Sequence, residues 1–254
     1  MIEPLVEHVA QRLDTDRRVE VRERLAEETP IALLFNGEAH VVMMATPQDL
    51  EDFAFGFALS EGIVADAAEL QLIEALPRGP GIALHLAIPA PRFEALQARR
   101  RQLPGRSGCG LCGAETLEQA ITPVRRVTSG KGVVPDRLRR GFTLLAARQT
   151  LNRDCGGLHA AAALCEDELI VREDVGRHNA LDKVLGALAR AGRRSEAVLL
   201  TSRASYELVH KAAAMDIGTL AAMSAPTAHA VRLAQQAGLA LYAFAREERI
   251  TRYA

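Results

Sequence analysis

The second half of the chain alternates apolar runs with amphipathic segments, and this alternation restricts the possible folds more than any other feature. We expect strands at 158–165, 168–173, 197–201, 219–225 and 239–245, and helices at 179–192, 204–216 and 226–238. The turn of the first hairpin is expected at Glu166-Asp167, and Pro226 should open the last helix. Strands that alternate with helices form a layered sheet that is covered on both faces. The pattern therefore predicts an α/β fold with α/β/α layers.

The first part of the chain predicts mixed α and β structure. Residues 30–46 contain two apolar runs joined by Asn36-Gly37, a strong hairpin signal, and residues 82–88 resemble a further strand. Between them we predict a helix over 46–62, in which Thr46 is the cap and Pro47 is the first helical residue.

The pattern weakens from about residue 89 to residue 123, where we expect a linker and a functional loop. The chain is long enough for one large domain or two modest ones. We predict a smaller mixed α+β N-terminal domain over 1–98, a basic and mobile loop over 99–123, and the layered α/β domain over 124–254.

The charge balance excludes some partners. The 31 Lys and Arg residues against 32 Asp and Glu residues give a formal net charge of −1, so no basic field points to nucleic acid or to an anionic membrane. The N-terminal residues lack the apolar core of a secretory signal, and charges interrupt the later apolar runs. Four cysteines do not form a disulfide framework in a chain of this length. We therefore expect a cytoplasmic protein.

Two of the cysteines, Cys109 and Cys112, lie in the glycine-rich stretch "SGCGLCG". Arginines upstream favour thiolate over thiol, namely Arg99, Arg100, Arg101 and Arg106. The pair has three interpretations. It could be half of a zinc site completed by Cys155, His159 or Cys165; it could be a thioredoxin-like redox pair, which the Pro/Gly/Arg surroundings disfavour; or it could carry sulfur as a persulfide. The loop suits the third interpretation best, because a carrier thiol must be accessible and acidic.

Polar residues gather at three junctions where a predicted strand is followed by a helix. Ligands of open α/β sheets bind beyond the carboxyl ends of the strands, and helix N-termini there bind phosphates. The candidate residues are Arg177, His178, Ser202, Arg203, Ser205, Ser224 and Thr227. Ordinary helix capping explains any single junction, but the three together favour a ligand that carries phosphate.

Other residues near these junctions admit simpler interpretations. Asp182 and Lys183, in "EDVGRHNALDK", can be read as solvated charges on a helix. His159 is either a satisfied strand histidine or part of the same pocket. Cys155 and Cys165 are expected to be small buried or half-buried residues rather than catalytic ones.

The chain resembles the FdhD family of formate dehydrogenase accessory proteins. The resemblance includes the segments "TPQDLEDFAFGFALSEGI", "CGLCG", "GGLHAAAAL", "EDVGRHNALDK", "SRASYELVHK", "SAPTAHAVRLA" and "LALYAFAREERITRYA". It implies a sulfur carrier, a sulfurtransferase that receives sulfur from a cysteine desulfurase and passes it to the molybdenum bis-guanine dinucleotide cofactor of formate dehydrogenase. It also implies a homodimer and a cytidine-deaminase-like fold for the larger domain.

The resemblance assigns roles to individual residues. Cys109 matches the persulfide-bearing cysteine and Cys112 matches its partner. The cofactor-binding stretch of the family matches Phe244, Ala245, Arg246, Glu247, Glu248 and Arg249. Cys155 departs from the family pattern, in which a small hydroxyl residue is expected before the glycine pair.

Two alternative functions follow from the same features. A zinc deaminase needs an HxE motif and a PCxxC motif, but Ala-Ala follows His159, Asn-Ala follows His178, and Gly108 precedes Cys109, so we reject this activity. A non-covalent cofactor chaperone, with structural or redox cysteines, is the main alternative to a sulfur carrier. The sequence predicts no permanent metal site.

Overall fold

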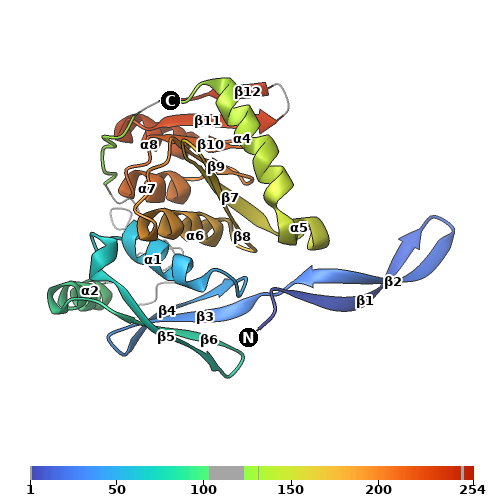
Figure 1. Ribbon diagram of the computed structural model, residues 1–254, viewed down its shortest axis with the longest axis horizontal. Helices are drawn as coiled ribbons and strands as arrows, with labels where there is room; N and C mark the ends of the chain where they lie inside the picture. Colours follow the sequence, from blue (N-terminus) through green and yellow to red (C-terminus); the bar gives the residue numbers. More distant parts are fainter. Residues whose placement is uncertain (1, 103–122, 131, 247–248) are drawn as a thin grey trace.

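The computed structural model describes residues 2–102, 123–130, 132–246 and 249–254 (Figure 1). Within these ranges the chain forms three β-sheets. A six-stranded sheet lies in the C-terminal part, a four-stranded sheet lies in the N-terminal part, and a two-stranded ribbon extends away from the body. The protein is therefore a mixed α/β protein.

The six-stranded sheet is mostly built from the predicted alternation. Its strands in spatial order are β12 (Arg249–Arg252), β11 (Ala240–Arg246), β10 (Thr219–Ala222), β9 (Ala197–Leu200), β7 (His159–Leu164) and β8 (Leu169–Asp174). The central strands β9, β10 and β11 are parallel, whereas β7, β8 and β12 join by antiparallel pairing. The β7–β8 pair confirms the hairpin predicted around Glu166-Asp167.

Helices cover both faces of this sheet. One face carries α6 (Arg177–Arg190), α7 (Tyr206–Ala214) and α8 (Ala228–Ala237), and the other carries α4 (Pro135–Arg148). Along β7, Ala161 and Ala163 pack with the three-helix side, while Ala160 and Ala162 pack with the α4 side. This alternation follows from the two-residue period of a strand. It confirms that both faces of the predicted sheet are covered.

The four-stranded sheet has the order β4 (Glu38–Ala45), β3 (Thr29–Phe35), β6 (Gly81–Ala87) and β5 (Gln71–Arg78). The predicted hairpin is β3–β4, and its turn residues Asn36 and Gly37 have φ angles of 48° and 86°. Such positive angles are what a two-residue type I′ turn requires, which explains the Asn-Gly pair. The predicted strand over 82–88 is confirmed as β6.

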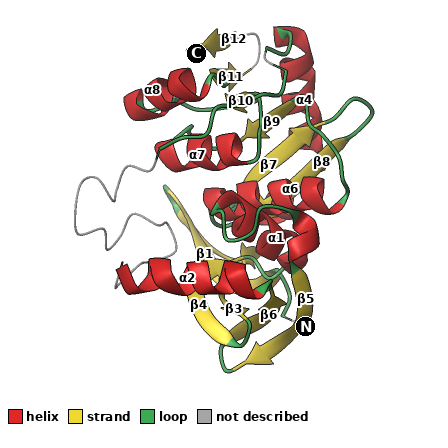
Figure 2. Ribbon diagram, turned by 90° about the vertical axis from the view of Figure 1, so that its left-hand side faces the viewer, coloured by secondary structure: helices red, strands yellow, loops and turns green. Residues whose placement is uncertain are grey.

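Helix α1 (Leu50–Ser60) lies between the two halves of the molecule. Its residues Phe53 and Phe57 pack with Ile31 and Leu84 of the four-stranded sheet, and its other side lies against α6. Figure 2 shows α8, α7, α6 and α1 stacked one below another, with α2 (Ala90–Gln102) beneath. The helices thus link the two sheets.

The contact between α1 and α6 overturns one interpretation of the sequence. Asp182 and Lys183 are 1% and 0% exposed, so they are not solvated charges. Asp182 accepts hydrogen bonds from Ser60 at 2.8 Å and from Lys211 at 3.0 Å. The helical pattern of α6 predicts one buried face, but it cannot show that α1 covers a second one.

The ribbon consists of β1 (Leu5–Asp14) and β2 (Arg17–Ala26), which pair in register along their whole length. It projects from the body in Figure 1 and contacts α5 (Thr150–Cys155) through an Arg24–Asp154 ion pair of 2.5 Å. The sequence analysis did not predict this ribbon. It also made no prediction for β5, α4, α5 or the short 3₁₀ turn η1 (Ala67–Glu69).

Several predicted boundaries were wrong. Helix α1 begins at Leu50 rather than Pro47, because Asp49 before it has a left-handed φ of 54° and Thr46 bonds elsewhere. Helix α8 begins at Ala228, after Pro226, with Thr227 as its cap. Part of the expected linker is the regular helix α2, and β11 is followed by β12 rather than being the last strand. The proposed domain limits stay a prediction.

Candidate functional site

The predicted ligand-binding junctions meet at one edge of the six-stranded sheet. The parallel strands β9, β10 and β11 end there, β8 ends there, and β7 begins there. Main-chain hydrogen bonds join the loops: Ala204 N–H donates to Ala225 at 3.2 Å, Thr227 N–H to Ala204 at 3.0 Å, and Phe244 N–H to Ser224 at 3.2 Å. These hydrogen bonds join three stretches of chain, the loops after β9 and β10 and the end of β11, which parallel topology brings to one edge.

The three helices that begin at this edge differ in how they are capped. Thr227 caps α8 in the ordinary way, because its Oγ1 accepts the Ala230 N–H at 3.2 Å. Gly176 and Ser205 precede α6 and α7 without forming any side-chain cap. The capping interpretation therefore accounts for Thr227. At the start of α7 the Glu207 carboxylate interacts with its own backbone N–H, whereas the start of α6 keeps N–H groups that can bind an anion.

The other polar candidates lie beside these starts. Ser205 is 9% exposed, and its hydroxyl interacts with the Glu207 carboxylate, whose ionised form it favours. Ser202 donates to the Arg203 carbonyl at 3.1 Å, and the Arg203 side chain is exposed. Ser224 is partly buried and connects the β10 loop to Phe244. Arg203 can therefore reach a bound molecule only from the solvent side.

A cluster of charged side chains lies between the starts of α6 and α7. Arg177 Nε and His178 Nε2 are buried atoms that have no hydrogen-bond partner among the described residues. His178 Nε2 lies 3.7 Å from Glu207 Oε2, which is beyond hydrogen-bond distance but within ion-pair range. These unsatisfied donors are the feature of the edge that most favours a ligand, because a buried donor without an acceptor is costly.

The electrostatics of the cluster show how closely its members interact. The interaction with His178 is the largest cause that lowers the pKa of Glu207 to about 2, so its carboxylate is ionised at neutral pH. Burial lowers the pKa of His159, and the charges of Arg177 and His178 act in the same direction. His159 therefore lies within electrostatic range of Arg177 and His178.

The C-terminal stretch reaches this edge through β11. Phe244 has a positive φ of 52° at a bulge between Ala243 and Arg246, and the Arg249 guanidinium lies 4.5 Å from the centre of its ring. Arg246 Nε donates to the Met223 carbonyl at 3.1 Å. Ala245 is buried, while Glu247 and Glu248 lie outside the described residues.

Cys109 and Cys112 also lie outside the described residues. The chain before them is tied to α1, because Arg99 donates to the carbonyls of Glu61 and Gly62 at 3.3 and 3.1 Å. The chain after them returns at Pro123, whose backbone forms a hydrogen bond with His210 of α7.

The other two cysteines are as expected. Cys155 is half-buried at the end of α5, Cys165 is buried, and burial raises the pKa of the Cys165 thiol. In the ranges that the structure covers, no three His, Cys, Asp or Glu side chains gather in a way that could hold a metal ion. No helix in those ranges is long and apolar enough to cross a membrane.

Two site residues escaped the sequence analysis. Glu207 stands in "SRASYE", and its position in the first turn of a helix was a usable signal, because carboxylates are favoured there. Asp174 is the last residue of β8, just before the turn to α6, and is completely buried. One of its partners, the Thr46 N–H, lies 128 residues away in the chain, so no local pattern could reveal that contact.

Comparison with known proteins identifies the relatives of this chain. The sulfur carrier protein FdhD of Cupriavidus necator is 54% identical over 88% of this chain and 79% of its own. That of Bordetella petrii is 48% identical over 88% of this chain and 82% of its own. A crystal structure described as a formate dehydrogenase accessory protein from Desulfotalea psychrophila is 25% identical, with a TM-score of 0.74, and covers 98% of this chain and 96% of that one. The FdhD/NarQ family matches residues 26–254, and the chain therefore belongs to the FdhD/NarQ family.

Proposed function

We propose that this protein is a sulfur carrier that loads sulfur on Cys109 as a persulfide and passes it to the molybdenum bis-guanine dinucleotide cofactor. The donor is a cysteine desulfurase, and the client is a formate dehydrogenase. Relatives about half identical to this chain are named sulfur carrier proteins, which supports the proposal. The protein would act as a sulfurtransferase in the cytoplasm.

The observation that carries the binding half of the proposal is the set of unsatisfied donors at the sheet edge. Arg177 Nε is a buried atom without a hydrogen-bond partner in the described chain, and His178 Nε2 lies beyond hydrogen-bond distance of Glu207. Both lie beside the uncapped start of α6. Phosphates of the cofactor would accept from these groups. Arg203, Ser224 and the stretch from Phe244 to Arg249 would line the same site.

The chemistry of loading and release balances with the two cysteines and an external thiol reductant. The Cys109 thiolate attacks the outer sulfur of the desulfurase persulfide, which forms the Cys109 persulfide and frees the desulfurase cysteine as a thiolate. The Cys112 thiolate then attacks the inner sulfur of that persulfide. This forms a Cys109–Cys112 disulfide and expels the outer sulfur as hydrosulfide for the acceptor, and a cellular thiol reductant restores the pair.

The remaining predictions belong to the same proposal. The larger part, residues 124–254, would share the cytidine-deaminase fold, with residues 1–98 as a smaller domain and 99–123 as the basic loop. Two copies would form a homodimer. The alternative of a non-covalent chaperone keeps the ligand site but assigns the cysteines to structure or redox sensing.

A mass measurement separates these functions. After incubation with a cysteine desulfurase and cysteine, the intact protein should gain the mass of one sulfur atom, and Cys109→Ala should not. Cys155→Ala is the matched control and should load normally. Loading of Cys109→Ala to the wild-type extent, or no loading of the wild type, would favour the non-covalent chaperone.

A further inference from the structure

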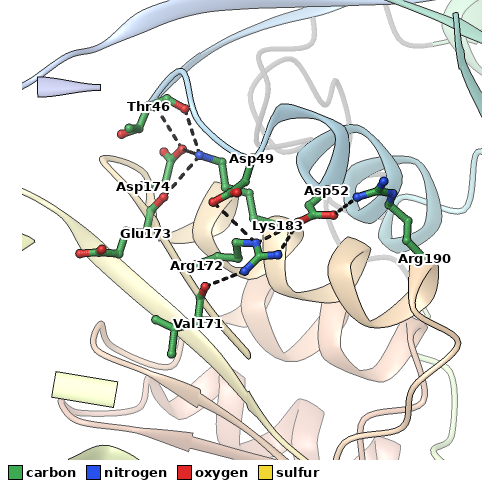
Figure 3. Close-up of polar contacts among 9 residues, drawn as sticks. All are labelled: Thr46, Asp49, Asp52, Val171, Arg172, Glu173, Asp174, Lys183 and Arg190. Carbon is green, nitrogen blue, oxygen red and sulfur yellow. Dashed lines mark hydrogen bonds and ion pairs between the residues drawn. The ribbon is translucent and has the colours of Figure 1, made fainter. Parts of the chain in front are cut away.

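The turn that presents Arg177 and His178 is held by one buried carboxylate, that of Asp174. Figure 3 shows this carboxylate with its partners Thr46 and Lys183. Asp174 Oδ1 accepts the Gly176 N–H at 2.8 Å and the Asn179 amide at 3.0 Å. Its Oδ2 accepts the Thr46 N–H at 3.0 Å and forms an ion pair of 2.7 Å with Lys183. Because every contact of this carboxylate is made inside the protein, the turn has little freedom to move.

Thr46, from the chain between β4 and α1, accepts two further hydrogen bonds from this part of the molecule. Its Oγ1 accepts the Val175 N–H at 3.1 Å, and its carbonyl accepts from Lys183 Nζ at 3.0 Å. Asn179 donates at 2.8 Å to the carbonyl of Met44, which lies in β4 two residues before Thr46. The N-terminal half of the molecule therefore supplies a wall of the turn.

The turn is also packed too tightly to accept a side chain. A β-carbon on Gly176 would lie 2.8 Å from Asn179 Nδ2 and 3.4 Å from Asp174 Oδ1. Real β-carbons do not come as close as 2.8 Å to another atom, so any substitution of Gly176 must displace the Asn179 amide. The hydrogen bonds and the packing thus specify one conformation.

We infer that Thr46, Asp174 and Lys183 are positioning residues, which aim His178 and Arg177 at the anion that the edge binds. This inference rests on the proposed function, since it assigns the phosphate site to the start of α6. It makes the N-terminal half contribute to the ligand site through the turn that it holds. Preorganised donors bind more tightly because the cost of ordering them is met during folding.

A purely structural role for such a network is the natural rival explanation, and a neighbouring ion pair provides the control. Asp52 of α1 is 4% exposed and accepts from Arg172 at 2.7 Å and from Arg190 at 2.5 Å. It joins the same segments as Asp174 does, as Figure 3 shows, but it makes none of the contacts to the turn described above. Asp52→Asn should therefore weaken the interface while leaving the turn in place.

The decisive variant is Thr46→Val, which keeps the shape of the side chain but leaves the Val175 N–H without its acceptor. Thr46→Ser restores the hydroxyl and should rescue the variant. The first readout needs no ligand: the carboxyl carbon resonance of Glu207 at pH 4.5. Ionisation of the Glu207 carboxyl group depends most on His178. Ser205 and the Glu207 backbone N–H also favour it.

In the wild type, Glu207 should be fully ionised at pH 4.5. In Thr46→Val, a displaced His178 should leave it partly protonated, as an ordinary glutamate is at this pH. Thr46→Ser and Asp52→Asn should match the wild type. An unchanged Glu207 signal in Thr46→Val, or an equal change in Asp52→Asn, would overturn the inference.

The second readout is the dissociation constant for guanosine diphosphate. Thr46→Val should weaken binding by about tenfold, the loss expected for one hydrogen bond to a charged group, while Thr46→Ser and Asp52→Asn should not. If the wild type does not bind the nucleotide, the proposed ligand is wrong, and the Glu207 signal still decides the positioning role. If the wild type binds but Thr46→Val binds equally well, the positioning role is wrong and the ligand site stands.

Discussion

Gly56 of α1 and Gly186 of α6 lie backbone to backbone where the two helices cross. A β-carbon on Gly56 would be 2.8 Å from the Gly186 nitrogen, and one on Gly186 would be 2.7 Å from the Gly56 nitrogen. Only two glycines allow helices to approach so closely. This crossing joins the four-stranded sheet, through α1, to the helix whose first turn forms the candidate site.

Gly56→Ala should therefore destabilise the whole protein. The new methyl group would stand 1.7 Å from the Asp182 carbonyl oxygen, so one helix must move. We expect a loss of about 3 kcal/mol or more in the free energy of unfolding, the upper end for overpacking. Urea denaturation measures it. Gly157→Ala is the control, because its β-carbon would meet only Ala26 at 3.9 Å. Equal stabilities of the two variants would contradict the close approach of α1 and α6 at Gly56.

The ion pair of Glu207 should make stability depend on pH. Its pKa is lowered from 4.5 to about 2 in the folded protein, so its contribution is present above about pH 4.5 and is lost as the pH falls towards about 2. The contribution is at most about 3 kcal/mol, and less after screening by solvent. Glu207→Gln should therefore be less stable than the wild type at pH 7, with a smaller difference at pH 3.

Urea denaturation of both proteins at pH 7 and pH 3 tests this dependence. His178→Gln removes the largest cause of the shift and should reduce the pH dependence in the same way. If the wild type and Glu207→Gln differ by the same amount at both pH values, Glu207 does not have a lowered pKa.

His159 should report the charge of Arg177 directly. Burial is the largest cause of its lowered pKa, and Arg177 is the next. Arg177→Ala should raise this pKa part of the way towards 6.5, whereas Arg203→Ala should leave it unchanged, since Arg203 is not among the charges that act on His159. Titration of the imidazole resonances by nuclear magnetic resonance measures the shift. An unchanged His159 pKa in Arg177→Ala would show that the charge of Arg177 does not act on His159.

Guanosine diphosphate should bind the sheet edge as a fragment of the cofactor, and adenosine diphosphate should bind less tightly. Arg177→Ala and Arg203→Ala should each weaken binding by about tenfold to a hundredfold, corresponding to about 1.5–3 kcal/mol for a charge-assisted contact. Arg194→Ala removes an exposed arginine that precedes β9 at the opposite edge and should have no effect. Calorimetry on the wild type and the three variants measures these affinities. If Arg177→Ala or Arg203→Ala binds as tightly as the wild type, that arginine is not part of the site.

The alternation of the second half was predictable because each element carries its own signal. Apolar runs of four to seven residues, helical faces and the glycines at 192 and 238 are local features, and β7 to β11 lie where the pattern placed them. It was also predictable that the loops meet at one edge of the sheet, because parallel strands end on the same side. The ribbon β1–β2 was missed because most residues of its two strands are exposed. Neither strand has a buried apolar face that would mark it in the sequence.

The sequence by itself determined the family, the layered sheet and the polar junctions of the candidate site, because these depend on residues that are close together in the chain. Only the tertiary structure decided which charges are buried and what orients them. Thr46 and Asp174 are 128 residues apart, and they meet because α1 packs across α6 at Gly56 and Gly186. A contact of this kind is a property of how the two halves pack, and no periodicity in either half encodes it.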